Sequence, residues 1–242
     1  MDAAQKFETT LKTASEQMGA GLSYEVVAHW LPFAVEPVTV ENFLGNTTLY
    51  PKALPLSKRE LFLYQAMIRE IFRKVAAGED LSFDQAAPVS IPDDIVKFAR
   101  TEKEAVLLFL DGVAPAGIID LLDLNQEKLA TLVCFSCQSE KMEKIAEVKI
   151  DFGLSETQRL VLTSGDLVLV PAEKQQRVEL LISCFAKAKI GKATKAKVIT
   201  TTGLVGLVFD CRGRPFKGPD LTLSSRELLK KWQKAFGIEG SL

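Results

Sequence analysis

Histidine is almost absent from this chain, since His29 is the only one among 242 residues. A nucleophile–histidine catalytic pair, or a zinc site built from several histidines, would have to use this residue. His29 lies between Ala28 and Trp30, with no carboxylate close to it in sequence. We therefore expect a packed or capping role for His29 and no catalytic or metal-binding role.

Long apolar runs and an excess of one charge sign are also absent. No run approaches the ~18 apolar residues needed to cross a bilayer. The first residues, MDAAQKFE, lack the hydrophobic core of a secretory signal. The 30 Lys and Arg residues against 31 Asp and Glu leave a formal charge of −1, which gives no overall attraction to nucleic acid or anionic lipid. We expect a cytoplasmic protein with no nucleic-acid or membrane partner.

Cysteine is scarce, with four residues in the chain. Cys134 and Cys137 form a C-x-x-C pair, whereas Cys184 and Cys211 are isolated in apolar runs. A structural zinc site needs a second close pair of Cys or His, and a thioredoxin-like pair opens a helix after a strand. Nothing near Cys134 supports either context. We expect reduced, half-buried thiols, no metal and no cofactor.

Helical patterns fill the first part of the chain. Apolar residues recur at three- and four-residue steps in 3–18 and predict a helix, and a short helix is expected at 24–30. A helical or extended piece near 40–44 should be broken by Gly45-Asn46.

The clearest predicted helix begins at Ser57, which forms a capping box with Glu60. We expect this helix to run to about Ala76, with an apolar stripe facing inward. Arg69, Glu70 and other charged residues are assigned to its solvated face.

An α/β layer should follow. We expect a loop at 78–101, a helix at 102–112, a strand at 117–122 and a further helix from Asn125. Residues 1–142 are thereby predicted to form one helical α/β domain.

The composition then changes to short strands separated by turns. Strands are expected at the following ranges: 147–152, 159–163, 166–170, 177–185, 195–201 and 206–210. This spacing predicts a small β-barrel or sandwich, and an amphipathic helix at 224–236 completes a second domain, 143–242. The predicted fold class is α+β.

Several polar residues are candidates for a site. Asp120 and Asp123 flank the end of a predicted strand, where turn and cap roles compete with a pocket role. Lys195 and Lys197 alternate along a predicted strand, so both ammonium groups share one face. Lysines on such a face either protect a sheet edge or bind an anion or a partner.

The stretch GLVGLVFDCRGRPF at 203–216 reads as a buried strand, a tight turn and a short returning strand. Arg212 and Arg214 flank Gly213 in this turn, and both are expected to be exposed. They either clamp a carboxylate elsewhere in the fold or face a partner.

Four stretches resemble the C-terminal half of the glutamate mutase accessory proteins of the MutL/GlmL type, members of the actin-like ATPase superfamily and unrelated to mismatch-repair MutL. They are HWLPF at 29–33, GNTTLYP at 45–51 with the helix that follows, LLFLDGVAPAGII at 107–119 and GLVFDCRGRP at 206–215. The resemblance implies that 1–142 is the remnant of an actin-like lobe. It also implies an accessory, reactivase- or chaperone-like role on a partner such as a coenzyme-B12-dependent mutase.

The chain departs from this family at the nucleotide site. The superfamily places a glycine pair against the adenosine, but the corresponding segment LSFDQAAPVSIP at 81–92 has no glycine. A Cβ blocks the close approach of backbone to a ligand. We therefore expect no competent ATP site, no catalytic residues and no enzyme activity. Two alternatives stay open: a fragment or subunit of a nucleotide-dependent actin-like ATPase, and a structural scaffold module of a larger assembly.

Overall fold

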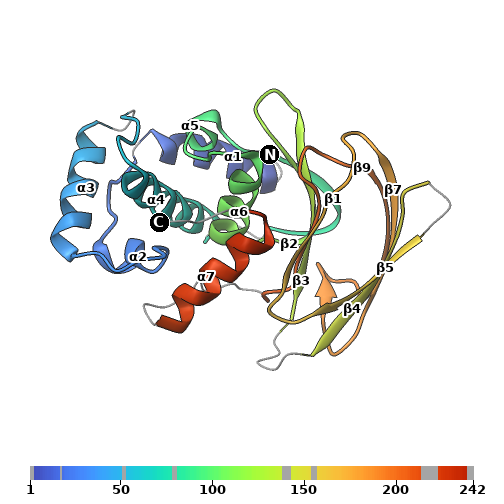
Figure 1. The fold of residues 1–242 in the computed structure, drawn as a ribbon. Helices are drawn as coiled ribbons and strands as arrows, with labels where there is room; N and C mark the ends of the chain where they lie inside the picture. The colour runs from blue at the N-terminus through green and yellow to red at the C-terminus, as the bar shows by residue number, and fades with distance from the viewer. Residues whose placement is uncertain are drawn as a thin grey trace. The chain divides into compact units, whose positions relative to one another are not determined.

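The structure is a computed structural model that describes residues 3–16, 18–50, 53–77, 81–137, 143–153, 157–213 and 223–238. The chain is mixed α and β and divides into two compact units (Figure 1). The helical unit comprises Met1–Asp80, Pro92–Val113 and Lys217–Leu242, and the strand unit comprises Leu81–Ile91 and Ala114–Phe216. This division differs from the single boundary near residue 142 that the sequence suggests.

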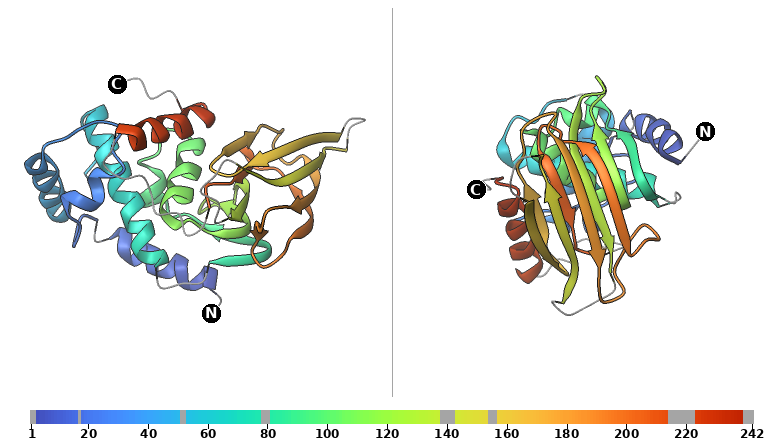
Figure 2. Two further views of the ribbon diagram at one scale, coloured as in Figure 1. Left: turned by 90° about the horizontal axis from the view of Figure 1, so that it is seen from below. Right: turned by 90° about the vertical axis from the view of Figure 1, so that its right-hand side faces the viewer.

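The helical unit is built around one long helix. Its helices are α1 (Ala3–Ser15), α2 (Tyr24–Ala28), α3 (Pro37–Leu49), α4 (Lys58–Ala76), α5 (Asp93–Val96), α6 (Glu102–Val113) and α7 (Leu223–Ala235). Helices α1, α2 and α6 all pack against α4. Figures 1 and 2 agree that α3 lies at the margin of this unit, on the other side of α4 from α6.

The local signals at α4 act as expected. The Glu60 backbone N–H donates to the Ser57 hydroxyl at 3.1 Å, and the Glu60 carboxylate accepts from the Leu56 N–H at 2.6 Å. These bonds satisfy donors that the first helical turn leaves open. By contrast, Gly45 and Asn46 do not end α3, which continues to Leu49.

The strand unit consists of two sheets. Its strands are β1 (Ser82–Ser90), β2 (Ala116–Leu122), β3 (Lys128–Ser136), β4 (Lys144–Asp151), β5 (Thr157–Thr163), β6 (Leu167–Val170), β7 (Arg177–Cys184), β8 (Lys189–Ile190), β9 (Lys195–Thr201) and β10 (Gly206–Asp210). One sheet has the order β1-β2-β3-β10-β6, with β8 also on β3, and the other has the order β5-β4-β7-β9.

The two sheets form two layers around one apolar core (Figure 1). Phe135 of β3 and Phe209 of β10 belong to this core together with Val148 of β4 and Leu180 of β7. Neither sheet closes on itself. Among the described residues, the end strands β1, β6, β5 and β9 each pair with one neighbour. Of the two predicted alternatives, the barrel is therefore wrong, and the two-layered arrangement corresponds to the sandwich.

Two segments differ from their predicted structure. Residues 82–90 form the edge strand β1, where the sequence suggests a loop, and the edge position tolerates Pro88. The helix expected from Asn125 is instead a turn followed by β3. Since β3 is covered on both faces, its apolar run lacks the alternation that marks a half-buried strand.

The close pairing of β1 with β2 depends on Gly117. Its φ is +100°, and a Cβ there would lie 1.8 Å from the Phe83 carbonyl oxygen. Only glycine allows this approach without strain. In the described part of the chain, every helix is too short or too polar to traverse a bilayer.

Candidate partner-binding groove

A groove of about 460 Å³ opens in the helical unit between α3 and the beginning of α4. Phe43 and Tyr64 are its buried aromatic residues, and Asn42 and Asn46 line it from α3. The residues just before α4 complete it, with Leu56 among them. A hollow of this size, largely apolar with a few polar groups, is typical of a binding site.

The rim of the groove carries unusually exposed apolar side chains. Leu56 is 92% exposed, Tyr50 67% and Leu54 63%, and Leu49 beside them is 73% exposed. Single exposed leucines are common on protein surfaces, but neighbouring ones around a hollow mark interaction sites. A partner that covers this rim would remove their apolar surface from water.

Tyr64 brings a hydroxyl group to the groove. Its ring meets Phe43 edge-on at 4.9 Å and stacks on Phe98 at 4.5 Å, and the residue is only 4% exposed. Among the described residues, its hydroxyl has no hydrogen-bond partner. Burial, helped by the Glu60 carboxylate, raises the pKa of Tyr64, so the neutral hydroxyl can serve a ligand as donor or acceptor.

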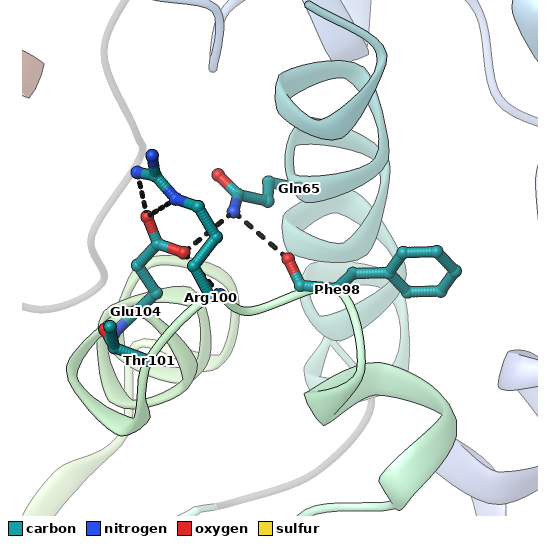
Figure 3. Close-up of polar contacts among 5 residues, drawn as sticks. All are labelled: Gln65, Phe98, Arg100, Thr101 and Glu104. Carbon is teal, nitrogen blue, oxygen red and sulfur yellow. Dashed lines mark hydrogen bonds and ion pairs between the residues drawn. The ribbon is translucent and has the colours of Figure 1, made fainter. Parts of the chain in front are cut away.

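A hydrogen-bonded cluster holds the backbone of Phe98, whose ring stacks on Tyr64; Figure 3 shows the cluster. The Gln65 amide donates to the Phe98 carbonyl at 3.1 Å and to the Glu104 carboxylate at 3.2 Å. Glu104 also accepts from the Arg100 backbone N–H at 2.7 Å and from Arg100 Nε at 2.8 Å. This pairing with Glu104 raises the pKa of Arg100. The cluster therefore ties α4 to α6 and holds an aromatic side chain beneath the groove.

The polar residues around the groove give a ligand means of orientation. Asn42 and Asn46 are four residues apart on α3, so their amides project on one side of the helix. Arg59 lines the groove and lies over the Phe33 ring at 5.4 Å. Donors and acceptors of this kind set the direction of binding, while apolar contacts supply affinity.

Two of the charged residues that the sequence assigns to the solvated face of α4, Arg69 and Glu70, are buried, whereas Arg73 on the same helix is exposed as expected. Arg69 Nε lies 2.7 Å from Asp111 Oδ2, with side chains 4% and 1% exposed. Glu70 accepts from Trp30 Nε1 at 2.6 Å and from Arg73 Nε at 2.8 Å. The prediction of a solvated face is thus wrong for Arg69 and Glu70, because α2 and α6 cover that part of α4.

The candidate carboxylates have local roles. Asp120 Oδ1 lies 2.5 Å from Lys128 Nζ and accepts from the Thr131 hydroxyl at 3.1 Å. Asp123 Oδ1 accepts from the Glu127 N–H at 2.8 Å in the turn between β2 and β3. Asp123 thus has a turn role, whereas Asp120 contacts side chains of the neighbouring strand β3.

The arginine turn departs from its expected exposure. The Arg212 side chain is 1% exposed and its guanidinium clamps Asp210, which is fully buried, with Nε–Oδ1 at 3.0 Å and an NH2–Oδ2 contact at 2.8 Å. The predicted exposure of Arg212 is therefore wrong, and the carboxylate that it meets is two residues away. Arg214 lies outside the described residues.

The candidate lysines occupy the exposed face of β9. Lys195 and Lys197 are both exposed and are separated by the less exposed Ala196. Lys197 Nζ lies 2.9 Å from Glu179 Oε1 on β7.

None of the four cysteines, all of which lie in the described ranges, forms a disulfide, and Cys134, Cys137 and Cys211 are buried more deeply than expected. Burial is the main cause that raises the pKa of the Cys211 thiol, and it raises the pKa of Cys184 to about 11. In the described ranges, no three His, Cys, Asp or Glu side chains are arranged to hold a metal ion.

Comparisons with family models, with curated proteins and with solved structures find no match to this chain. The resemblance to the glutamate mutase accessory proteins therefore stays an expectation from the sequence. The groove itself was missed at the level of sequence. Its signal is the apolar content of 49–56, LYPKALPL, between two helices where a polar connection is the norm.

Proposed function

We propose that this chain is a non-catalytic accessory protein that binds a protein partner through the groove between α3 and α4. The observation that carries the proposal is the exposed apolar rim, above all Leu56 at 92% exposure. Full burial of one leucine side chain contributes about 1.5–3 kcal/mol. Tyr64 and Arg59, which also line the groove, are of residue types that are enriched in the hot spots of protein interfaces.

The partner to test is a coenzyme-B12-dependent mutase, as the family resemblance implies. In this proposal the chain has a reactivase- or chaperone-like role, works in the cytoplasm and holds no cofactor of its own. The groove supplies apolar contacts, and Asn42, Asn46 and the Tyr64 hydroxyl orient the partner segment.

The experiment is a pull-down with the tagged full chain from native cell extract, followed by mass spectrometry. The captured protein is then purified and its Kd measured by calorimetry for the unaltered chain and for L54D/L56D. The matched control is L228D, since Leu228 is also exposed, at 42%, but lies on α7 and does not line the groove. We expect the groove variant to lose at least tenfold in affinity and the control to keep it. Equal affinity of all three proteins would refute the groove as the binding site.

Two further measurements separate the proposal from its alternatives. ATP with Mg²⁺ should leave the thermal unfolding temperature of the chain unchanged, because 81–92 carries side chains where an actin-like site needs bare backbone. A rise in that temperature would favour a nucleotide-dependent ATPase. Static light scattering should show no self-assembly into a large oligomer, which a scaffold module would form.

A further inference from the structure

Strand β9 is an edge of the four-stranded sheet in the strand unit. It pairs with β7 along its whole length, from Lys195 opposite Ser183 to Thr201 opposite Arg177. Within the described residues, no strand pairs with its other side. Its outer N–H and C=O groups are therefore a template for an added strand.

The chain around this edge is strongly basic. Between 187 and 197 there are five lysines, Lys187, Lys189, Lys192, Lys195 and Lys197, and no acidic residue. Each of these lysines is exposed. The segment therefore carries a local positive charge although the whole chain has a formal charge of −1.

Part of this charge is left uncompensated on the outer face of the sheet. The register places Lys149 of β4, Leu181 of β7 and Lys197 of β9 in one row across the strands. The neighbouring row holds Glu147, Ser183 and Lys195. A hollow of about 430 Å³ lies over these two rows.

The acidic residues near this hollow are already paired. Glu147 Oε2 lies 2.6 Å from Arg159, which lowers the pKa of Glu147, and Glu179 lies 2.9 Å from Lys197. Among the described residues, neither Lys149 nor Lys195 has a carboxylate within ion-pair distance. Lys195, beside Ser183 on the edge strand, is thus available for a carboxylate of a ligand, while Lys149 in the next row, opposite Leu181, acts on Glu147 only through its electrostatic field.

We propose that β9 is a docking strand for an extended, acidic segment of a protein partner. The segment adds to the sheet beside β9 at the usual strand separation of about 4.8 Å. Side chains directly opposite Lys195 and Lys197 then have their Cβ atoms within about 4.5–5.5 Å, which suits Glu or Asp. The alternate positions lie next to Ala196 and Val198 and suit apolar residues.

The same geometry disfavours a second copy of this chain as the occupant. Antiparallel pairing of β9 with itself would bring the lysines of one copy close to those of the other, and like charges on paired strands are destabilising. The partner is therefore a segment with alternating acidic and apolar residues. Its binding does not depend on the groove of the helical unit.

Fluorescence anisotropy with the full chain and a labelled peptide, EVEVEVE, tests the proposal at 50 mM salt. We expect saturable binding that K195E/K197E weakens at least tenfold. The matched control is K230E/K234E on α7, which makes the same change in net charge at two exposed lysines of the helical unit. Its Kd for the peptide should stay within twofold of that of the unaltered chain. Circular dichroism of each variant verifies folding.

A second peptide tests strand addition itself. EVEVEVE N-methylated at two consecutive central residues keeps its charges but loses an N–H on both of its edges, and it should bind at least tenfold more weakly. Several results would overturn the proposal: no binding of EVEVEVE up to millimolar concentration, equal effects of the two lysine pairs, or equal affinity of the methylated peptide. Tighter binding of an oligothymidine at the same lysines would instead assign the surface to single-stranded nucleic acid.

Discussion

Removal of the Asp111 carboxylate should leave the Arg69 guanidinium charged and unpaired inside the helical unit. The two side chains are 4% and 1% exposed, and Nε lies 2.7 Å from Oδ2. Water has little room to replace the carboxylate, because α4 and α6 are in close contact there. A Cβ on Gly112 would already lie 2.6 Å from the Arg69 carbonyl oxygen. Loss of one member of a buried pair costs about 3–5 kcal/mol, so D111A should lower the free energy of unfolding by this amount.

Urea unfolding followed by tryptophan fluorescence measures the effect in the right part of the chain. Both tryptophans, Trp30 and Trp232, belong to the helical unit, so the signal reports that unit rather than the sheets. The double variant R69M/D111L removes both charges and keeps apolar volume, and its stability should return to within about 2 kcal/mol of the unaltered chain.

A loss below about 1 kcal/mol in D111A would refute the reasoning, since that is the range of solvent-exposed ion pairs. A double variant as unstable as D111A would also refute it, because the deficit would then come from lost packing and not from the stranded charge.

Three further predictions concern the backbone at Gly117, the N-terminal cap of α4 and the titration of Tyr64. G117A should lower the free energy of unfolding by more than the ~1–3 kcal/mol of backbone strain, because its Cβ also meets Phe83. G153A, at φ +71° with nothing within 4 Å of the new Cβ, should lower it only by the strain. Urea unfolding followed by far-UV circular dichroism compares the two variants. S57A should lose about 1 kcal/mol by removing the cap of α4, measured by tryptophan fluorescence in urea. Because the folded pKa of Tyr64 is raised above 10.0, its contribution to stability is complete below pH 10.0 and is lost as the pH rises through the folded value. Y64F should therefore lose less stability than the unaltered chain between pH 9.5 and 11.5, and parallel urea titrations that show no difference would contradict this assignment.

Sequence patterns succeeded where structure is decided locally. The capping box at Ser57 and Glu60 marks the beginning of α4, and the periodic apolar residues of 102–112 mark α6. The short strand-like runs between turns identified β4, β7 and β9. The sequence prediction failed at β3, where a helix was expected, because both faces of that strand are covered and its apolar run has no period.

The candidate site was predicted only in part. The alternation of Lys195 and Lys197 on one face follows from the strand period and could be read directly. The groove could not be predicted from the sequence, because Tyr64 of α4 and Asn46 of α3 meet there only in the folded chain. The exposure of Leu56 also depends on what the tertiary structure leaves uncovered.

The sequence by itself determined the class of the fold and most helix and strand positions, because capping, periodicity and turns act over a few neighbouring residues. Only the tertiary structure decided which charges are buried and which apolar residues are exposed. Arg69 and Glu70 lie on a helix whose pattern assigns them to solvent, yet their partners Asp111 and Trp30 stand about 40 residues away. The physical reason is that burial depends on which elements pack together, and short-range patterns along the chain do not encode that packing.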